Sequence, residues 1–378
     1  MKEMSARERV RVALNHEEPD RVPLALGGSW YGITDPLYFA AVEELALGEP
    51  AAPFRPKRSH TVNYYDDRLL EALGVDIRHI WLGFSEMGAP PAGGGRDNWG
   101  IEWVESDGYR GARLHPLASA TIEDLETYPW PGSDGLDLEA VRSRVKAIRA
   151  SGDYAIAARA VNSYGLFELC CLLRGPEQFM VDLLTDPDFA HALVRKVGDV
   201  FYSLTEVYLD VAGKDLDLME LPGDDYADKR SLIIAPALFR EFFAPEWRRL
   251  ITLVKGYSPD IKVVFHSDGA ITPLLGDLLD VGIDVFHPLE PLEVTDQAAV
   301  KKTYGDRLSF LGGVDIKEAL QGEQQAISRE IRERLGNLAP GGGYILAPAN
   351  HIQRDVPAAN LLFLFREAAR LGRYPLAL

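Results

Sequence analysis

A histidine and an aspartate stand two residues apart in the segment His266-Ser267-Asp268-Gly269, directly after an apolar run. Glu290 follows the next apolar run along the chain. Imidazole and carboxylate groups that point to one centre are typical ligands of zinc or of a harder divalent ion, which could activate a thiol or a water. The sequence therefore suggests a metal site of these three residues. In the other interpretation, His266 and Asp268 only hydrogen-bond substrate or backbone.

Four further titratable residues could act as general acids or bases. Asp224 and Asp225 are adjacent, and two carboxylates in a crowded pocket can have their pKa values pushed apart. Glu86 and His351 each lie close behind an apolar run and are candidates of the same kind. We interpret the four as catalytic, while two alternatives stay open: the aspartates could cap the helix that follows them, and Glu86 could belong to a mobile insertion.

Aromatic, amide and glycine residues near the same positions could bind a substrate. The aromatic rings could line a pocket for a flat ligand, or simply pack, and a glycine could let the backbone approach a ligand closely. The predicted substrate-binding residues are Trp30, Tyr31, Tyr164, Asn162, Asn350 and Gly313.

The candidates share one position relative to the expected secondary structure, because they follow short runs of β-branched and aliphatic residues. Eight such runs alternate with amphipathic stretches, and several are almost wholly apolar, which favours a parallel sheet covered on both faces. Eight strands of this kind predict an α/β fold, a single (β/α)8 TIM barrel, whose active site lies at the carboxyl ends of its strands. The expected strands are Val22–Leu26, Ile77–Phe84, Tyr154–Val161, Leu216–Leu221, Ile261–Phe265, Ile283–Phe286, Leu308–Leu311 and Tyr344–Ala347.

The segments between these runs predict helices and one long interruption. Ser5 caps an expected helix over Ala6–Leu14, and Asp186-Pro187 begins another over Phe189–Val211. Similar apolar stripes run through Pro236–Val254 and Val356–Leu371. Residues 85–150, which contain a triple glycine and two tryptophans, are expected to form an insertion after the second strand, as a hairpin or lid over the barrel mouth.

Composition excludes several classes of protein. The chain has 378 residues, and 57 acidic against 40 basic side chains give a net charge of -17, which repels nucleic acid and anionic membrane surfaces. We expect no nucleic-acid partner. The only cysteines, Cys170 and Cys171, are adjacent and form no metal motif, which indicates a reducing compartment. Neither a secretion signal nor a membrane-spanning run is present, so a cytoplasmic protein is expected.

Short segments spread over essentially the whole chain form a family pattern. They are Arg7-Glu8-Arg9, His16-Glu17-Glu18-Pro19-Asp20-Arg21-Val22-Pro23, Leu73-Gly74-Val75-Asp76, Trp99-Gly100, His115-Pro116-Leu117, Leu173-Arg174-Gly175, Gly223-Asp224-Asp225, Phe265-His266-Ser267-Asp268-Gly269, Gly312-Gly313-Val314-Asp315, Ala347-Pro348, Ile352-Gln353 and Asp355-Val356-Pro357. Together they resemble the uroporphyrinogen decarboxylase superfamily. The resemblance does not fix the reaction, because that superfamily includes the decarboxylase proper, corrinoid-dependent methyltransferases and O-demethylase-type enzymes.

The resemblance to the decarboxylase proper fails at the residues that would hold its substrate. Two arginines of the family's first loop, which bind the acidic groups of the tetrapyrrole, fall on Gly28 and Gly32. The family's catalytic aspartate corresponds to Glu86, and its barrel tyrosine to Cys171. We therefore expect that the chain does not decarboxylate a porphyrinogen.

The resemblance to the methyltransferase branch implies zinc held by a His-x-Cys pair and a second cysteine. Here His266 matches, Asp268 replaces the first cysteine, and the other falls on Asn350, next to His351. A site without thiolates offers only hard nitrogen and oxygen ligands, and a metal bound there is suited to polarising an oxygen atom. The resemblance thus favours a methyl group moved between a small methylated donor, such as a methyl ether, and a corrinoid (cobalamin) protein. It also implies a homodimer.

Three hypotheses are carried forward: a methyltransferase that docks a methyl-corrinoid protein, a decarboxylase of a smaller carboxylated substrate, and a non-catalytic barrel that binds tetrapyrrole or corrinoid. The second needs a cationic clamp, for which Arg159 and the more distant Arg174 are the candidates. The third leaves a pocket of titratable groups without a use, although burying unpaired charge is costly.

Overall fold

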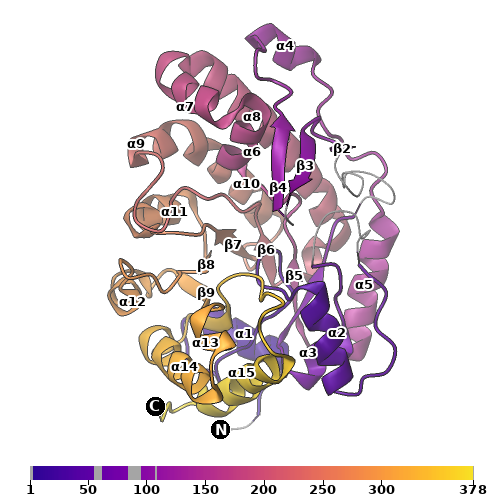
Figure 1. The fold of residues 1–378 in the computed structure, drawn as a ribbon, viewed down its shortest axis with the longest axis vertical. Helices are drawn as coiled ribbons and strands as arrows, with labels where there is room; N and C mark the ends of the chain where they lie inside the picture. The colour runs from indigo at the N-terminus through magenta and orange to yellow at the C-terminus, as the bar shows by residue number, and fades with distance from the viewer. Residues whose placement is uncertain (1–2, 55–61, 84–94, 107–108, 378) are drawn as a thin grey trace.

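The chain forms an α/β structure around a curled, seven-stranded parallel sheet (Figure 1). The structure is a computed structural model and describes residues 3–54, 62–83, 95–106 and 109–377. The strands follow one another in chain order, and every neighbouring pair is parallel. They are β1 (Ile77–Ile80), β5 (Ala155–Ala158), β6 (Leu218–Glu220), β7 (Lys262–His266), β8 (Val285–His287), β9 (Ser309–Val314) and β10 (Tyr344–Pro348).

The segment expected as the first strand pairs more weakly than the others. Leu24 forms an isolated parallel bridge with Leu346 of β10, and the Ala25 amide donates to the Leu346 carbonyl over 3.0 Å. On its other side, the Leu24 carbonyl accepts from the Asp76 amide, directly before β1, over 2.9 Å. The segment therefore hydrogen-bonds to both edges of the sheet without forming a strand of its own, and the closed eight-stranded barrel stays a prediction.

The inner face of the sheet changes character from one end to the other. At the amino end it is apolar, and its side chains form one buried cluster with Val10 and Leu14 of the first helix. Because side chains alternate along a strand, the residue two positions later on each strand faces the same way. On four strands that later residue is His79, Glu220, His266 or His287, all buried. Polar side chains thus gather at the carboxyl end of the inner face.

Helices cover the outer face, as Figure 1 shows. Ser5 and Asp186 accept hydrogen bonds from backbone amides in the first turns of α1 and α8, which confirms both expected starts. The helices are α1 (Ala6–Leu14), α2 (Asp35–Glu44), α3 (Asp67–Ala72), α4 (Ile122–Thr127), α5 (Leu138–Ser151), α6 (Leu166–Arg174), α7 (Pro176–Thr185), α8 (Pro187–Ala212), η1 (Gly213–Asp215), α9 (Pro236–Leu238), the π-helix η2 (Phe239–Phe243), α10 (Ala244–Tyr257), η3 (Thr272–Leu274), α11 (Leu275–Val281), α12 (Gln297–Tyr304), α13 (Glu318–Gln321), α14 (Gln324–Leu338) and α15 (Ala358–Leu371). Among the described helices, none is both long and apolar enough to span a bilayer.

A small antiparallel sheet interrupts the alternation of strands and helices between β1 and α5. It consists of β2 (Gly95–Arg96), β3 (Glu102–Ser106) and β4 (Tyr109–Leu114), followed by α4. Its rings reach the segment behind β5, where Trp103 stacks on Tyr164 with centroids 5.9 Å apart and Trp99 donates to Asn162 over 3.3 Å. The predicted insertion therefore touches the carboxyl end of the parallel sheet. α5, also within residues 85–150, instead packs against β1 and α8.

Buried ion pairs stabilise the opposite, amino end of the sheet. Asp76, directly before β1, accepts hydrogen bonds from Arg9 over 2.6 Å and from Arg21 over 2.7 Å, and from the Leu24 amide. Asp217, directly before β6, forms ion pairs with Arg7 and Arg11, which both belong to α1. Both carboxylate side chains are 2% exposed, so each depends on its arginines for compensation.

Replacing Asp76 by asparagine should destabilise the fold. Asp76→Asn leaves the buried Arg9 side chain with one carboxylate fewer, and breaking a buried pair costs about 3–5 kcal/mol. Urea denaturation should show the loss. The matched control is Glu139→Gln, because Glu139 pairs with Arg142 on the surface of α5 and its side chain is 78% exposed. The control should change the free energy of unfolding by less than about 1 kcal/mol, and an equal effect of both variants would contradict the assignment.

Candidate active site

A pocket of about 230 Å³ opens at the carboxyl end of the parallel sheet. Its walls come from the turns after several strands, which is where sites collect in folds of this kind. The lining residues are Ser29, Trp30, Ser163, Tyr164, Glu168, Gly223, Asp225, His266, Asp268, Asn350 and His351. Seven of the residues that we predicted from the sequence therefore lie around one cavity.

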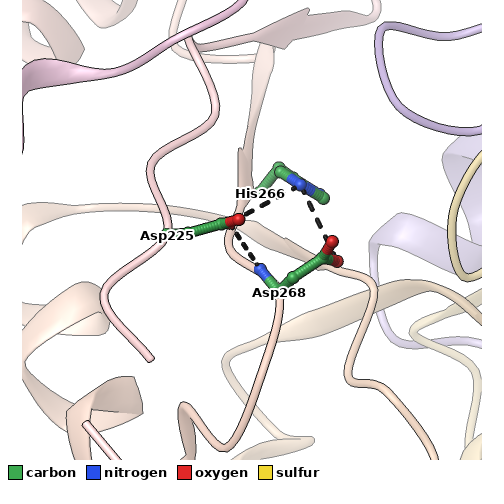
Figure 2. Close-up of side chains that lie close together, drawn as sticks. All are labelled: Asp225, His266 and Asp268. Atoms are coloured by element: carbon green, nitrogen blue, oxygen red, sulfur yellow. Dashed lines mark hydrogen bonds and ion pairs between the residues drawn. The ribbon is translucent and has the colours of Figure 1, made fainter. Parts of the chain in front are cut away.

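Asp225, His266 and Asp268 converge in this pocket, as Figure 2 shows. His266 ends β7, Asp268 lies in the turn behind it, and Asp225 follows β6. His266 Nε2 lies 3.9 Å from Asp225 Oδ1 and 3.8 Å from Asp268 Oδ1. One ligand atom from each of the three can be chosen so that all lie within 4.8 Å of one another. This spacing would allow one cation to contact all three.

The hydrogen bonds around His266 determine which of its two ring nitrogens carries the proton. His287 Nε2 lies 3.3 Å from the Pro348 carbonyl, which can only accept, so His287 Nε2 carries the proton. His287 Nδ1 must then accept from His266 Nδ1, 2.8 Å away. Burial lowers the pKa of His266 to about 3 and also lowers that of His287, so both rings are neutral. His266 Nε2 therefore offers a lone pair towards Asp225 and Asp268.

The carboxylates opposite that lone pair lack compensation. Burial, with the charges of Asp225 and Glu290, raises the pKa of Asp268 to about 8. Asp268 Oδ1 is buried without a hydrogen-bond partner, whereas Oδ2 accepts from Asn350 over 2.8 Å. Among the described residues, Asp225 Oδ1 accepts a hydrogen bond only from the Asp268 amide, over 2.8 Å, and burial raises the pKa of Asp225 as well. A lone pair and two poorly compensated carboxylates around one point favour a bound cation.

Glu168 completes the acidic lining and was not predicted from the sequence. It lies in the first turn of α6, and its Oε2 accepts from the Asp225 amide over 3.3 Å. Burial, followed by the charges of Asp225 and Asp224, raises its pKa to about 9. Glu168 therefore fixes the turn that carries Asp225, and no feature of its neighbouring sequence distinguishes it from other acidic residues of a first helical turn.

Trp30 covers the imidazole of the site. Its ring is parallel to that of His266, with an interplanar angle of 2° and centroids 4.6 Å apart. A Cβ atom added at Gly223 would lie 2.6 Å from Trp30 Nε1 and 2.7 Å from His266 Cδ2. Only glycine fits there without displacing both rings. Trp30, predicted to bind substrate, thus also holds His266 in place.

Asp224 is fully buried and holds a helix. Its carboxylate accepts from the Phe167 and Glu168 amides at the start of α6, each over 2.9 Å, and from the Tyr226 hydroxyl. Burial raises its pKa to about 7 despite these bonds. The two amide contacts hold the start of α6, which precedes Asp224 in the chain, whereas the alternative that we left open was a cap on the following helix. Asp224 does not line the pocket.

Two other predicted residues lie away from the pocket. Tyr31 is fully buried on the inner face of the sheet, where its hydroxyl donates to Glu220 and lies 3.0 Å from His79 Nε2. Gly313 belongs to β9 with a φ of +83°, and an added Cβ there would be 3.2 Å from Leu338 of α14. Both positions contribute to the core in this structure.

The remaining predicted residues border the site. His351 lines the pocket, and its Nδ1 accepts from the Gly32 amide over 2.9 Å. Asn162 donates to the Tyr164 carbonyl over 2.8 Å, which supports that wall of the pocket. Glu290 accepts from the Gly269 amide over 2.8 Å and is not one of the three clustered ligand groups. Glu86 lies outside the described residues.

A second, larger cavity of about 860 Å³ adjoins the pocket. It lies beyond the ends of β8 to β10, and Asp268 and Asn350 line both cavities. Glu290 belongs to this larger cavity, whose acidic side chains outnumber its basic ones. The metal candidates therefore lie where a small pocket and a wide acidic cleft meet.

Comparison with solved structures gives a relative of the same fold. A methyltransferase from Methanosarcina mazei is 19% identical, with 97% of this chain and 99% of that chain covered and a TM-score of 0.66. A B12-independent methionine synthase from Shewanella sp. W3-18-1 is 11% identical, with coverage of 93% and 98% and a TM-score of 0.46. At these identities the first similarity shows the fold, and the second is too distant to argue from. No curated protein sequence matches the chain.

The match of sequence to a family model is more specific. The model described as uroporphyrinogen decarboxylase matches residues 100–371, which include four of the strand-end turns that line the pocket and all three clustered ligand groups. Since the match covers well over half of the chain, the protein belongs to the uroporphyrinogen decarboxylase family.

Proposed function

We propose that this protein is a methyltransferase that moves a methyl group from a small methylated donor to a corrinoid carried by a partner protein, with the help of a divalent metal. The proposal includes a (β/α)8 barrel in which residues 22–26 supply the eighth strand. The observation that carries it is the convergence of His266 Nε2, free of a proton, with the carboxylates of Asp225 and Asp268. The Methanosarcina mazei methyltransferase, which shares the fold, supports it.

The residues present fit a metal ion. Asp225, His266 and Asp268 would hold it, and the unpartnered Asp268 Oδ1 gives a specific reason for a cation at this point. One imidazole and two carboxylates form a set without thiolate, which suits zinc or a harder divalent ion. Such an ion, when bound, acts as a Lewis acid that polarises an oxygen of the donor.

Methyl transfer then requires exact placement of the donor. The bond between the methyl carbon and the donor heteroatom breaks, the heteroatom keeps the electron pair, and a pair from the acceptor forms the new bond. Asn350 holds Asp268, and Glu168 holds the turn of Asp225. Trp30 shields one face of His266 from water. These contacts keep the reacting groups in one geometry, which is a large part of catalysis in a transfer reaction.

The structure also argues against a porphyrinogen as the substrate. An added Cβ at Gly28 would lie 2.1 Å from the Tyr31 ring, and at Gly32 it would lie 3.1 Å from Val62 and 3.2 Å from His351. The places of the two family arginines are therefore filled by other side chains. Without paired hydrogen bonds from these arginines, the carboxylates of such a substrate would lose their water without gaining a charged partner.

Metal content should separate the ligand set seen in the structure from the set predicted from the sequence. Asp225→Asn, His266→Ala and Asp268→Asn should each lose a stoichiometric divalent ion, because each removes one of the clustered ligands. Glu290→Gln should keep the metal, since Glu290 instead accepts from the Gly269 amide. Elemental analysis after purification without chelator measures this. Loss of metal in Glu290→Gln with retention in Asp225→Asn would restore the ligand set His266, Asp268 and Glu290.

Methyl transfer can be measured directly with reduced cobalamin as the acceptor. The wild type, supplied with zinc and a panel of small methyl ethers, should convert cob(I)alamin to methylcobalamin, which changes its absorbance. Asp225→Asn and Asp268→Asn should lower the rate by about 100-fold or more, because loss even of the groups that support metal ligands costs about 10–100-fold. Glu139→Gln, an exposed change on α5, should leave the rate unchanged.

Two results would overturn the proposal. Release of CO2 from a small carboxylate, without methylation of cobalamin, would favour the decarboxylase hypothesis. Binding of corrinoid without turnover of any tested donor by the metal-loaded protein would favour the non-catalytic barrel.

A further inference from the structure

Five arginine side chains are buried in the described part of the chain, and four of them have acidic partners. Arg9 pairs with Asp20 and Asp76, Arg78 with Asp67, and Arg174 with Asp182. The fourth, Arg334, pairs with Glu330 and Glu333. This pattern is expected, because a guanidinium taken out of water needs compensation.

Arg159 is the exception. It is 6% exposed and directly follows β5 at the carboxyl end of the sheet. No carboxylate among the described residues lies within ion-pair distance of its guanidinium, which instead lies over the Phe54 ring at 4.7 Å. Burial lowers its pKa, as expected for an uncompensated cation.

The acidic residue that acts on Arg159 electrostatically is already engaged elsewhere. The charge of Glu220 opposes the lowering of the Arg159 pKa. However, Glu220 Oε1 accepts from Tyr31 and lies 3.4 Å from His79 Nε2, while Oε2 accepts from the Ser29 amide. Within the described part of the chain, the donors of Arg159 therefore stay available to a group that enters from outside.

A small cavity beside Arg159 limits what that group can be. Its volume is about 20 Å³, enough for one water-sized group. Tyr38, Tyr64 and Tyr65 line it together with Arg159 and Asp66. The Asp66 carboxylate already accepts hydrogen bonds from Arg68 and from the Tyr38 hydroxyl. Such a space could take a carboxylate oxygen, which the planar guanidinium fork recognises, but not a whole phosphate group.

The subsite is tied to the candidate active site through one loop. The amide of Ala160, next to Arg159, donates to Ser29 Oγ over 3.0 Å. Ser29 lines the active-site pocket, and the following residue, Trp30, stacks on His266. The loop of Ser29 and Trp30 thus connects the surroundings of Arg159 with the candidate active site.

We propose that Arg159 is an anion subsite that binds a carboxylate group of the substrate, so that the methyl donor is a small carboxylic acid. That the bound carboxylic acid is a methyl donor rests on the proposed function, whereas the carboxylate subsite itself does not. The position of Arg159, directly after β5, differs from the loop positions Gly28 and Gly32, at which the family's arginines would stand.

The first test measures thermal stability. If Arg159 serves binding and not folding, removing its uncompensated charge should not destabilise the protein. Arg159→Met should keep or raise the thermal midpoint, since a neutral side chain of similar length removes the desolvation cost. The matched control, Arg174→Met, should lower the midpoint by several degrees, because Arg174 is buried to a similar extent but pairs with Asp182 over 2.7 Å. Equal destabilisation by both variants would show that Arg159 has a structural role and overturn the proposal.

The second test is binding, measured by calorimetry with benzoate and its neutral isostere benzamide. The wild type should prefer benzoate by about tenfold or more, as hydrogen bonds to a charged group are worth about 1.5–3 kcal/mol. Arg159→Met should lose the preference, and Arg174→Lys should keep it. Inorganic phosphate should not compete. A preference that survives Arg159→Met, or equal binding of phosphate, would refute the carboxylate subsite.

A benzoate preference could also arise from a metal at the neighbouring pocket. The variant Asp268→Asn separates the two sources, because it removes a proposed metal ligand and leaves Arg159 intact. Its benzoate preference should equal that of the wild type. Loss of the preference in Asp268→Asn would place the carboxylate at the metal and refute the Arg159 subsite. The proposed methyl transfer is tested by turnover, so either proposal can fail while the other stands.

Discussion

The parallel register between β7 and β8 is the constraint on which the site depends. His266 and His287 are direct partners in that register, so their rings lie at the same height on the inner face. This brings their Nδ1 atoms to 2.8 Å, and the Pro348 carbonyl at the end of β10 then fixes the proton on the far nitrogen of His287. The backbone oxygen of Pro348 on β10 thereby determines which lone pair His266 presents on β7, three strands away. A slip of either strand by one residue would turn its imidazole to the outer face and separate the two rings.

The two ends of the inner face have opposite roles in stability. At the amino end, Asp76 and Asp217 join arginines of the first helix and its surroundings to the sheet through compensated charges. At the carboxyl end, the Oδ1 atom of the half-buried Asp268 and the buried side chain of Arg159 lack full compensation among the described residues. Proteins keep such unfavourable groups where a ligand uses them, and the well-paired end offsets their cost.

Much of this arrangement could be predicted from the sequence. Seven of the eight apolar runs are strands, and the positions of His266 and Asp268 directly at the end of one run placed them correctly in the pocket. The third residue of the candidate metal cluster was harder to predict. Asp225 and Glu290 both follow strands that neighbour β7, and only the turn geometry brings Asp225 Oδ1 to the Asp268 amide while Glu290 binds the Gly269 amide. Turns are set by contacts distant in sequence, so spacing alone could not choose.

The loop after residue 26 is a second place where the surroundings of side chains could not be predicted from the sequence. The Gly27 amide donates to the Tyr31 carbonyl over 2.7 Å, which folds the loop back on itself. Trp30 then faces His266, while its neighbour Tyr31 points into the core. Adjacent aromatic residues thus have unrelated surroundings. The buried polar residues of the inner face, Glu220, His79 and His287, do have a sequence signal, because each stands two positions after an apolar inward-facing residue of the same strand.

The shared wall between the small pocket and the wide acidic cleft has a kinetic consequence. Asp268 and Asn350 line both cavities, so each cavity offers its own approach to the same carboxylate. An occupant of one cavity need not leave before another molecule enters the second. The two reactants of a bimolecular reaction could therefore be held together in a ternary complex. An inhibitor that fills only the cleft would then lower the maximal rate without competing for the pocket.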